Sequence, residues 1–559
     1  MRLNNRELAN RAQWEKAGIQ LPLFDRPAMI EATKKTPEWV HFGAGNIFRI
    51  FPAALQQSLL EQGIEKTGII VVAGRDGEIL DRIFKPCDDL TLGVTLKANG
   101  GIQKKVIASI AESLWMGKEE DFEELKAIFR SPSLKMASFT ISEKAYNLYG
   151  PGGKTLPDAA ADFENGPEKR DGSGPENYLG KLTALLLERF RVRGSEGHLP
   201  LALALVSMDN CSHNGDKLFS AVELFARNWV QKGLVEKEFL DYIRDRTTLS
   251  FPWSMIDKIT PGPDKGVKEL LEKDGFTSTE FYCKTTPQAP FVNAEEPGYL
   301  VIEDNFPAGR PALEKAGVFF CSRETVDKVE KMKVCACLNP LHTALAIFGC
   351  LLGYTRISDE MKNPDLVKLI EGIGYREGLP AAADPLILSP REFIDEVINV
   401  RFPNPFMPDT PQRIAADSSQ KIPVRYGETI KAYLSGRVNV KPAPGEPPPK
   451  VEDLKLIPLV FAAWIRYLMG INDEGRPFTV SPDPLYASLA APLSSIALGD
   501  KGPFHSVLAP ILSDKSIFAV NLYEAGLGEK VERYFEELAA GPGAVAKTLK
   551  KYTALSPIA

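Results

Sequence analysis

The chain has 559 residues, of which 44% are hydrophobic and 25% are charged, and its formal net charge is -6. A single hydrophobic core stops growing well below this length, so at least two domains are expected. The acidic balance provides no basic field for nucleic acid, so no nucleic-acid partner is expected.

The seven cysteines are odd in number and scattered, and no apolar signal core marks the N-terminus. Both features favour reduced thiols and a cytoplasmic location. The most apolar helical stretch, Leu456–Leu468, contains a proline and an arginine. It falls short of the ~20 residues that span a bilayer, so no membrane partner is expected.

Residues 38–206 alternate short β-rich runs with amphipathic stretches, beginning with a strand at 39–42, a helix at 47–62 and a strand at 69–73. This alternation is typical of an α/β fold with a parallel sheet. A later apolar run, 201–208, ends in polar residues, as expected where a buried strand meets a ligand. We therefore predict a Rossmann-like dinucleotide-binding domain over residues 1–325.

From about Val329 onward the β-rich runs fade and helical periodicity dominates. It is clearest at residues 341–352, 390–399, 454–468 and 531–549. Residues 326–559 are therefore predicted to form a mostly α-helical domain that binds substrate.

A glycine-rich turn follows the first predicted strand and leads into a helical stretch. Glycines in this position let the backbone approach a pyrophosphate at the positive end of a helix. We expect Gly43, Gly45, Asn46 and Arg49 to bind the dinucleotide. The usual third glycine is absent, so an ordinary tight turn is the alternative reading.

The second predicted strand ends at Gly74-Arg75-Asp76. An acidic side chain at this point can accept hydrogen bonds from the adenosine ribose, so Asp76 favours NAD. The adjacent Arg75 suits a 2'-phosphate, which leaves NADP open.

Six blocks of sequence, taken together, resemble one family. They are residues 43–51, TISEKAY at 140–146, SMDN at 207–210 with NG at 214–215, IDKITP at 256–261, residues 302–342, and RFPNP at 401–405 with 413–423. The chain resembles the long-chain mannitol dehydrogenase family, which includes mannitol 2-dehydrogenases, fructuronate reductases and tagaturonate reductases. The resemblance implies a metal-free, NAD(P)-dependent oxidoreductase whose partner is a small-molecule sugar acid or polyol.

The family uses a lysine as general acid and base, with two asparagines and a histidine around the reacting oxygen. The resemblance assigns these roles to Lys333, Asn210, Asn339 and His342. The chemistry agrees, because a lysine in a dry cleft can take a proton from an alcohol and two amide groups can stabilise the alkoxide. No metal is needed.

Each of these residues also has an ordinary reading when taken alone. Lys333 can be a surface lysine, His342 a satisfied core histidine, and Asn339, which precedes a proline, a helix cap. Cys335 and Cys337, together with His342, raise the alternative of a zinc site, although their spacing is unusual for one.

The resemblance also assigns residues around the substrate. Arg413 and Lys421 match a block that binds substrate hydroxyls, and the arginine fork also suits a carboxylate. Glu143 matches the glutamate that passes the lysine's proton to solvent, and Asp257 and Glu330 match acidic residues of the same cleft. Ordinary surface charge is the alternative for Arg413 and Lys421.

The spacing after Lys333 departs from the family pattern, since residues 334–338 place five residues before Asn339 instead of four. A regular α-helix turns roughly 180° over the steps from Lys333 to His342, so the two side chains would face opposite ways. We therefore predict that 334–338 is not continuous α-helix, either because of a π-bulge or because a helix begins near Asn339. Lys333 and His342 then converge beside Asn210; otherwise Lys331 is the substitute.

The reaction expected from this resemblance is the interconversion of D-mannonate and D-fructuronate by hydride transfer. A hexitol such as mannitol, or altronate with tagaturonate, is an alternative, because no residue is unambiguously a carboxylate ligand. A non-catalytic nucleotide sensor is the rival from another class, and the altered lysine spacing and the missing glycine favour it.

Overall fold

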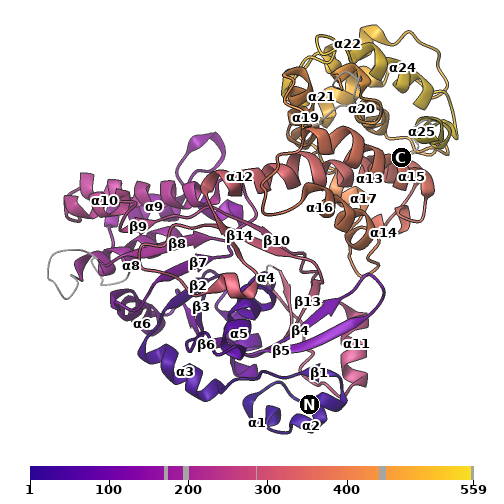
Figure 1. Ribbon diagram of the computed structural model, residues 1–559. Helices are drawn as coiled ribbons and strands as arrows, with labels where there is room; N and C mark the ends of the chain where they lie inside the picture. The colour runs from indigo at the N-terminus through magenta and orange to yellow at the C-terminus, as the bar shows by residue number, and fades with distance from the viewer. Residues whose placement is uncertain (169–173, 193–200, 285, 440–448, 555–559) are drawn as a thin grey trace. The chain divides into compact units, whose positions relative to one another are not determined.

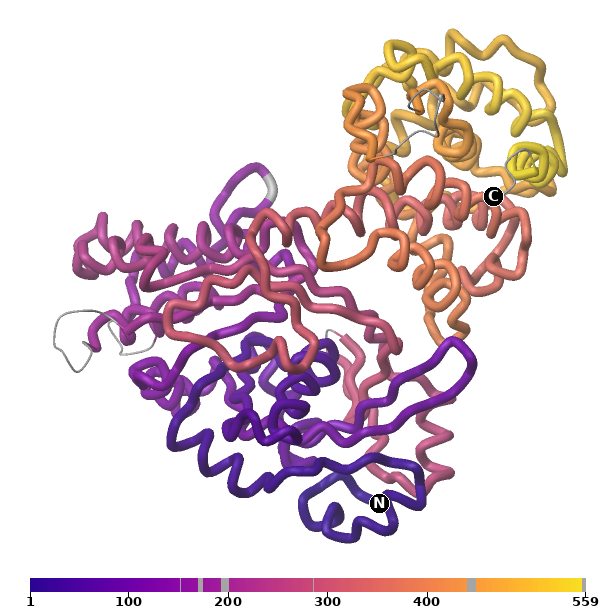
Figure 2. Tube along the Cα trace, in the orientation of Figure 1, coloured from indigo at the N-terminus to yellow at the C-terminus, as the bar shows by residue number. Residues whose placement is uncertain are grey.

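The computed structural model describes the chain except residues 169–173, 193–200, 285, 440–448 and 555–559. It divides into two units (Figures 1 and 2). The first comprises Met1–Lys97 and Gly101–Asp327, and the second comprises Ala98–Gly100 and Lys328–Ala559.

The first unit is built on a six-stranded sheet in the order β6-β3-β2-β7-β8-β9, with every neighbouring pair parallel. Its strands are β2 Trp39–Phe42, β3 Ile69–Ala73, β6 Ile110–Trp115, β7 Met136–Phe139, β8 Leu203–Ser207 and β9 Leu249–Ser250. Counted along the chain, this order is 3-2-1-4-5-6, the Rossmann arrangement. The predicted α/β fold is confirmed, and the order reverses between β2 and β7.

Helices cover both faces of this sheet (Figure 1). The helices of the unit are α1 Asn5–Leu8, α2 Arg11–Lys16, α3 Arg26–Lys35, α4 Asn46–Ile50, α5 Pro52–Glu61, α6 Glu119–Arg130, α7 Pro157–Asn165, α8 Tyr178–Arg191, α9 Asn214–Gln231, α10 Lys237–Arg244 and α11 Lys265–Lys273. Alternate strand residues point to opposite faces. Val40 and Val72 therefore pack with α6, α8 and α9, whereas Trp39 and Val71 pack with α5.

Among the described residues, three smaller sheets complete the first unit, and none of them was expected from the sequence. Their strands are β1 Ile19–Gln20, β5 Ile102–Ile107, β4 Thr91–Leu96 and β13 Phe291–Glu295; β10 Ser254–Asp257, β14 Tyr299–Glu303 and β15 Phe319–Cys321; and β11 Tyr282–Cys283 with β12 Pro287–Gln288. The helix predicted at 47–62 is also interrupted, since α4 ends at Ile50 and α5 begins at Pro52. Proline removes a backbone donor and so breaks the hydrogen-bond ladder there.

The second unit consists of helices among its described residues, apart from one isolated bridge between Ile471 and Pro477. They include α12 Arg323–Lys331, which begins in the first unit, α13 Asn339–Leu352, α14 Ile357–Glu360, α15 Pro364–Glu371, α16 Pro390–Glu396, α17 Pro411–Ala415, α18 Ser418–Ile422, α19 Glu428–Leu434, α20 Leu456–Leu468, α21 Tyr486–Leu493, α22 His505–Leu512, α23 Lys515–Phe518, α24 Gly528–Leu538 and α25 Ala544–Ala554. Helix α20 is buried along its whole length. The prediction that the C-terminal part of the chain is mostly α-helical is confirmed.

One predicted helical stretch of the second unit, 531–549, is divided in the structure. Helix α24 ends at Leu538 and α25 begins at Ala544. Gly541 and Gly543 lie between them with φ of +141° and +78°, a backbone region that L side chains rarely adopt. The helical periodicity of the sequence therefore continues across a glycine-rich turn that separates two helices.

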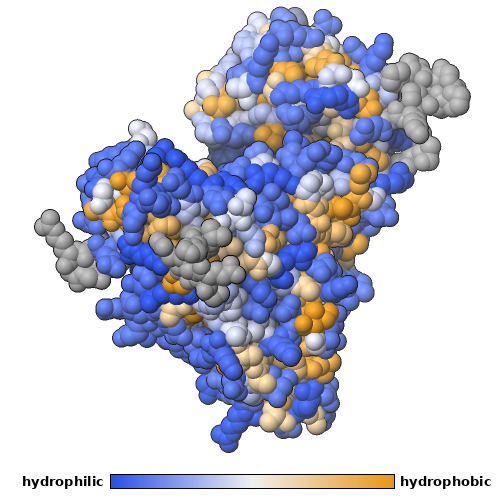
Figure 3. All heavy atoms as spheres, turned by 60° about the vertical axis from the view of Figure 1, so that its left-hand side comes forward, coloured by the Kyte–Doolittle hydropathy of each residue, from blue (hydrophilic) through white to orange (hydrophobic). Residues whose placement is uncertain are grey.

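The described part of the chain also contains one apolar helical segment longer than Leu456–Leu468. Arg323–Leu352 is long and apolar enough to cross a membrane by length and composition alone, but 78% of its apolar window is buried inside the structure. Burial of this kind is also shown by the core helix of a soluble protein. On the face drawn in Figure 3, hydrophilic side chains predominate and apolar side chains form separate patches between them.

Candidate active site

The glycine turn lies where the strand order of the sheet reverses. Gly43 follows β2 with φ +127°, and an added Cβ atom would collide with the carbonyl of Thr140 at the end of β7. Gly43 also donates its backbone N–H to Val72 on β3 at 3.0 Å. Glycine is required here because three strand ends converge, and such a reversal is where dinucleotides bind in open α/β sheets.

The next residues leave space in front of helix α4. Gly45 is the N-cap of α4, and a Cβ atom added there would meet nothing within 4 Å. Asn46 is buried, and its Oδ1 has no hydrogen-bond partner among the described residues. An open backbone and an unpaired amide oxygen fit a polar ligand at this turn.

Arg49 requires a correction, because its side chain does not reach this space. The guanidinium is fully buried and donates to Thr91 Oγ1 at 3.1 Å, Gln288 Oε1 at 3.3 Å and the carbonyl of Ala289 at 2.6 Å. With no exposed surface it cannot contact a cofactor. It instead ties α4 to the neighbouring four-stranded sheet.

Asp76 stands just after β3, as the sequence predicts, but its carboxylate already has a donor. The hydroxyl of Tyr282 lies 2.9 and 3.1 Å from its two oxygens, and Lys284 Nζ lies 3.9 Å away. The side chain is 20% exposed. Tyr282 was missed by the sequence analysis because it comes from a two-residue strand, β11, far along the chain.

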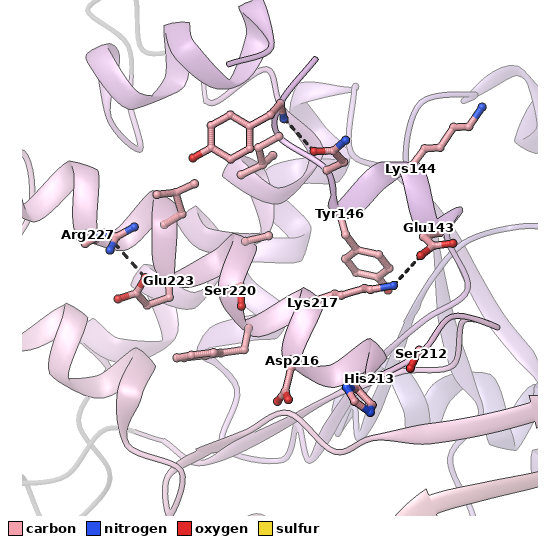
Figure 4. Close-up of a pocket in the computed structure, with 16 residues that line it drawn as sticks. Glu143, Lys144, Tyr146, Ser212, His213, Asp216, Lys217, Ser220, Glu223 and Arg227 are labelled. Carbon is pink, nitrogen blue, oxygen red and sulfur yellow. Dashed lines mark hydrogen bonds and ion pairs between the residues drawn. The ribbon is translucent and has the colours of Figure 1, made fainter. Parts of the chain in front are cut away.

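Glu143 begins the short 3-10 helix Glu143–Tyr146 after β7, and its carboxylate forms an ion pair with Lys217 Nζ at 2.5 Å. The two side chains point toward one another at the edge of a hollow of about 1080 Å³ beside α9 (Figure 4). Glu143 is thus open to solvent, as a group that exchanges protons with water must be.

Asn210 is exposed and lies just after the end of strand β8. The residue before it, Asp209, holds this end of the strand in place. Asp209 is buried, and its carboxylate accepts a hydrogen bond from the Tyr146 hydroxyl and another from Ser207 at 3.3 Å. Burial raises the pKa of Asp209 to about 7. Because Tyr146 ends the turn that Glu143 begins, the pair fastens the Glu143 turn to the Asn210 strand end.

The two acidic residues assigned to the cleft occupy different settings. Asp257 is buried at the end of β10, paired in register with Tyr299 on β14. Glu330 lies in the last turn of α12 and is half-buried.

The predicted break after Lys333 is confirmed. Helix α12 ends at Lys331, a π-helix runs over Met332–Cys337, and α13 begins at Asn339. Leu338 donates its N–H to the carbonyl of Lys333 at 3.1 Å, five residues back, which shows how the extra residue is accommodated. Both anticipated devices occur together, since a π-turn absorbs the residue and a new helix begins at Asn339.

This geometry decides between the ordinary readings of two residues. Lys333 is only 7% exposed, so it is not a surface lysine, whereas Lys331 is exposed. Asn339 is the first helical residue, and Leu338 occupies the capping position without any side-chain cap bond. The helix-cap alternative for Asn339 is therefore wrong.

His342 is not a satisfied core histidine. Its Nε2 is buried without a hydrogen-bond partner among the described residues, and the nearest carboxylate oxygen, from Asp409, is 3.6 Å away. The ring packs against Phe402 at a centroid distance of 5.1 Å. Burial lowers the pKa of His342 to about 4, against the opposing effect of Asp409. The imidazole is therefore neutral at pH 7.

Arg413 and Lys421 lie in the same unit as His342. Arg413 is 63% exposed and forms an ion pair with Asp409, the carboxylate that faces His342. Lys421 Nζ donates to the carbonyls of Ile414 and Ala416, and burial together with Arg425 lowers its pKa. Asp409 and Arg425 were missed, since neither belongs to a spacing pattern.

The zinc alternative gains no support from the described residues, among which no group of three metal-ligating side chains is found. None of the seven cysteines, all of which lie in the described part of the chain, forms a disulfide. Burial raises the pKa of Cys337, which disfavours the thiolate that zinc requires.

A parallel sheet with the Rossmann order, a glycine turn at its reversal and a separate helical unit together define a two-domain dehydrogenase of the dinucleotide-binding class. The mannitol dehydrogenase Rossmann domain matches residues 37–315, and the mannitol dehydrogenase C-terminal domain matches residues 325–539. The chain belongs to the mannitol dehydrogenase family. The resemblance and the enzyme class expected from the sequence are thereby confirmed.

Relatives extend over the whole chain. The D-mannonate oxidoreductase of Thermotoga maritima is 52% identical over 556 residues, covering 99% of each chain. A mannitol 2-dehydrogenase of Neosartorya fischeri is 27% identical, again over 99% of each chain. Among solved structures, the Pseudomonas fluorescens mannitol 2-dehydrogenase complex with NAD and D-mannitol superposes with a TM-score of 0.67 at 24% identity, covering both chains fully. A D-sorbitol dehydrogenase, covering 95% of this chain and 97% of its own, gives 0.72 at 23%.

Proposed function

We propose that this protein interconverts D-mannonate and D-fructuronate with NAD(P) as the hydride carrier. The observation that carries the proposal is the 52% identity, over 99% of both chains, to a D-mannonate oxidoreductase. The absence of a disulfide among the seven cysteines, all in the described part of the chain, supports a cytoplasmic location.

In this proposal Lys333 exchanges the proton of the substrate hydroxyl, Asn210 and Asn339 hold its oxygen, and His342 orients it. Glu143 passes the proton to solvent. The burial of Lys333 and the unpaired Nε2 of His342 support these roles, because both groups are withdrawn from bulk water. Asp257, Glu330, Arg413 and Lys421 are the other residues that we assign to the substrate.

Gly43, Gly45 and Asn46 would hold the dinucleotide, with Asp76 at its adenosine ribose. When bound, the dinucleotide supplies or accepts the hydride. The open backbone at Gly45 and the unpaired oxygen of Asn46 support this placement.

The proposal is tested by following NADH absorbance with fructuronate, tagaturonate and fructose in parallel. We expect the highest kcat/KM with fructuronate. A preference for tagaturonate or fructose would assign the protein to another branch of the family. No turnover with any of the three would favour the nucleotide sensor.

Replacing Asp76 with alanine should narrow the preference for NAD over NADP by about tenfold, because a carboxylate repels a 2'-phosphate. The measurement is the ratio of kcat/KM values for the two cofactors. Tyr282→Phe is the control, since it removes the hydroxyl donor but keeps the charge. An unchanged ratio in Asp76→Ala would transfer the role to another residue such as Glu78.

Activity should survive exhaustive treatment with EDTA, because a lysine and two amides together provide the electrophilic support that a metal supplies elsewhere. The assay is the fructuronate reaction before and after dialysis against the chelator. Loss of activity that zinc restores would revive the site at Cys335 and Cys337.

A further inference from the structure

Arg425 lies beside the proposed substrate residues but belongs to none of the patterns that identified them. It follows Lys421 by four residues, where α18 continues into the π-helix Pro423–Gly427. Residues four apart lie on neighbouring parts of one helix face. Arg425 is near enough to help lower the pKa of Lys421 and that of His342.

Contacts hold Arg425 against the first turns of α13. Its Nη1 donates to Thr343 Oγ1, and Thr343 Oγ1 in turn donates to the carbonyl of Asn339 at 2.9 Å. Thr343 directly follows His342. The guanidinium is therefore attached to the same turn that carries Asn339 and His342.

Among the described residues Arg425 has no acidic partner, which sets it apart from nearby arginines of the helical unit. Arg413 pairs with Asp409, and Arg401 lies 4.0 Å from Glu396. Within the described chain, no carboxylate forms an ion pair with Arg425, and its only hydrogen bond is the one to Thr343.

The charge of Arg425 is nevertheless retained. The side chain is partly buried, and burial lowers its pKa to about 10, so it remains a cation at neutral pH. A partly buried cation without a counter-charge is costly unless a ligand supplies one.

We propose that Arg425 binds the carboxylate of the substrate and thereby selects a sugar acid over a hexitol or ketohexose. The inference rests on the proposed function, which it deepens by naming the group that recognises the acid. A guanidinium can bind a carboxylate through two parallel N–H donors, and the bond to Thr343 uses Nη1 while leaving the other donors for the ligand. Lys421 and Arg413 increase the positive charge around the same position, partly offset by Asp409.

The test compares Arg425→Met, which keeps length and loses charge, with Arg425→Lys, which keeps charge and loses the fork. In Arg425→Met, kcat/KM for fructuronate should fall about a hundredfold, mainly through KM, while kcat/KM for fructose stays within about twofold. Arg425→Lys should lose about tenfold on fructuronate. Arg437→Met, the same change at an exposed arginine of this unit, is the control and should leave both substrates unaffected.

Equal losses on fructuronate and fructose in Arg425→Met, or no loss on fructuronate, would overturn the inference. Ligand-induced thermal stabilisation gives a readout independent of turnover. D-mannonate should raise the Tm of the wild type, and Arg425→Met should lose that increase while its Tm without ligand stays within a few degrees of the wild type. A mannonate-induced increase that persists in Arg425→Met would also overturn the inference.

These experiments distinguish failure of the proposed function from failure of the inference about Arg425. If the wild type reduces fructose but not fructuronate, the proposed function fails, and the mannonate-induced Tm shift still decides the role of Arg425. If the wild type and Arg425→Met reduce fructuronate equally well, the function stands and only the inference fails.

Discussion

Replacement of Lys333 with alanine should lower kcat for fructuronate by about a hundredfold or more, because the general acid and base would be lost. NADH should still bind with nearly wild-type affinity, since Lys333 belongs to the helical unit and the glycine turn to the Rossmann unit. Steady-state kinetics measure the first quantity and titration of NADH fluorescence measures the second.

The matched control is Lys331→Ala, two residues earlier, where the lysine is exposed at the end of α12. That variant should keep wild-type rates. Wild-type rates in Lys333→Ala, or a large loss in Lys331→Ala alone, would show that the general base has been assigned to the wrong lysine.

Glu360→Gln should raise the stability of the helical unit at pH 8.5 by several kcal/mol. Glu360 is fully buried at the end of α14, and neither carboxylate oxygen has a partner among the described residues. Space for it exists because residue 349 on α13 is glycine, where an added Cβ atom would collide with the carboxylate. Burial raises the pKa of Glu360 from 4.5 to about 9.

The direction of this pH dependence follows from the number of protons bound in the folded and unfolded states. Between about pH 4.5 and 9 the unfolded chain loses this proton while the folded chain retains it, so stability falls by about 1.4 kcal/mol per pH unit as pH rises. Glutamine is neutral at every pH and removes that dependence. The difference in Tm between Glu360→Gln and the wild type should therefore be small at pH 5 and large at pH 8.5.

Glu392→Gln, at an exposed position in the first turn of α16, is the control and should show no growth of the difference with pH. A Glu360→Gln variant whose Tm advantage is the same at both pH values would contradict the assignment of a buried neutral acid.

The main sheet could be predicted because its strands are short apolar runs set off by polar residues. β2 and β3 have the bounds expected from the sequence, and the glycine turn follows β2 directly. The smaller sheets could not be predicted, since β1 and β11 have only two residues each and β1 pairs with β5, which lies far along the chain. Pairing of that kind is set by tertiary contacts instead of local pattern.

The helical break beside Lys333 could be predicted by counting residues, because one extra residue must rotate or interrupt a helix. Which charged side chains are buried, and which of them have a counter-charge, could not be predicted in this way. Arg49, expected at the cofactor, is occupied by hydrogen bonds to three distant groups, whereas Arg425, which no motif marked, has no acidic partner. These differences depend on which segments the fold brings together.

The most direct test of the central claim is to reduce fructuronate with NADH that carries deuterium at the transferred position and to determine the product by mass spectrometry. The account predicts D-mannonate with one deuterium bound to the carbon that was the ketone. D-mannonate without deuterium, or no D-mannonate at all, would contradict it.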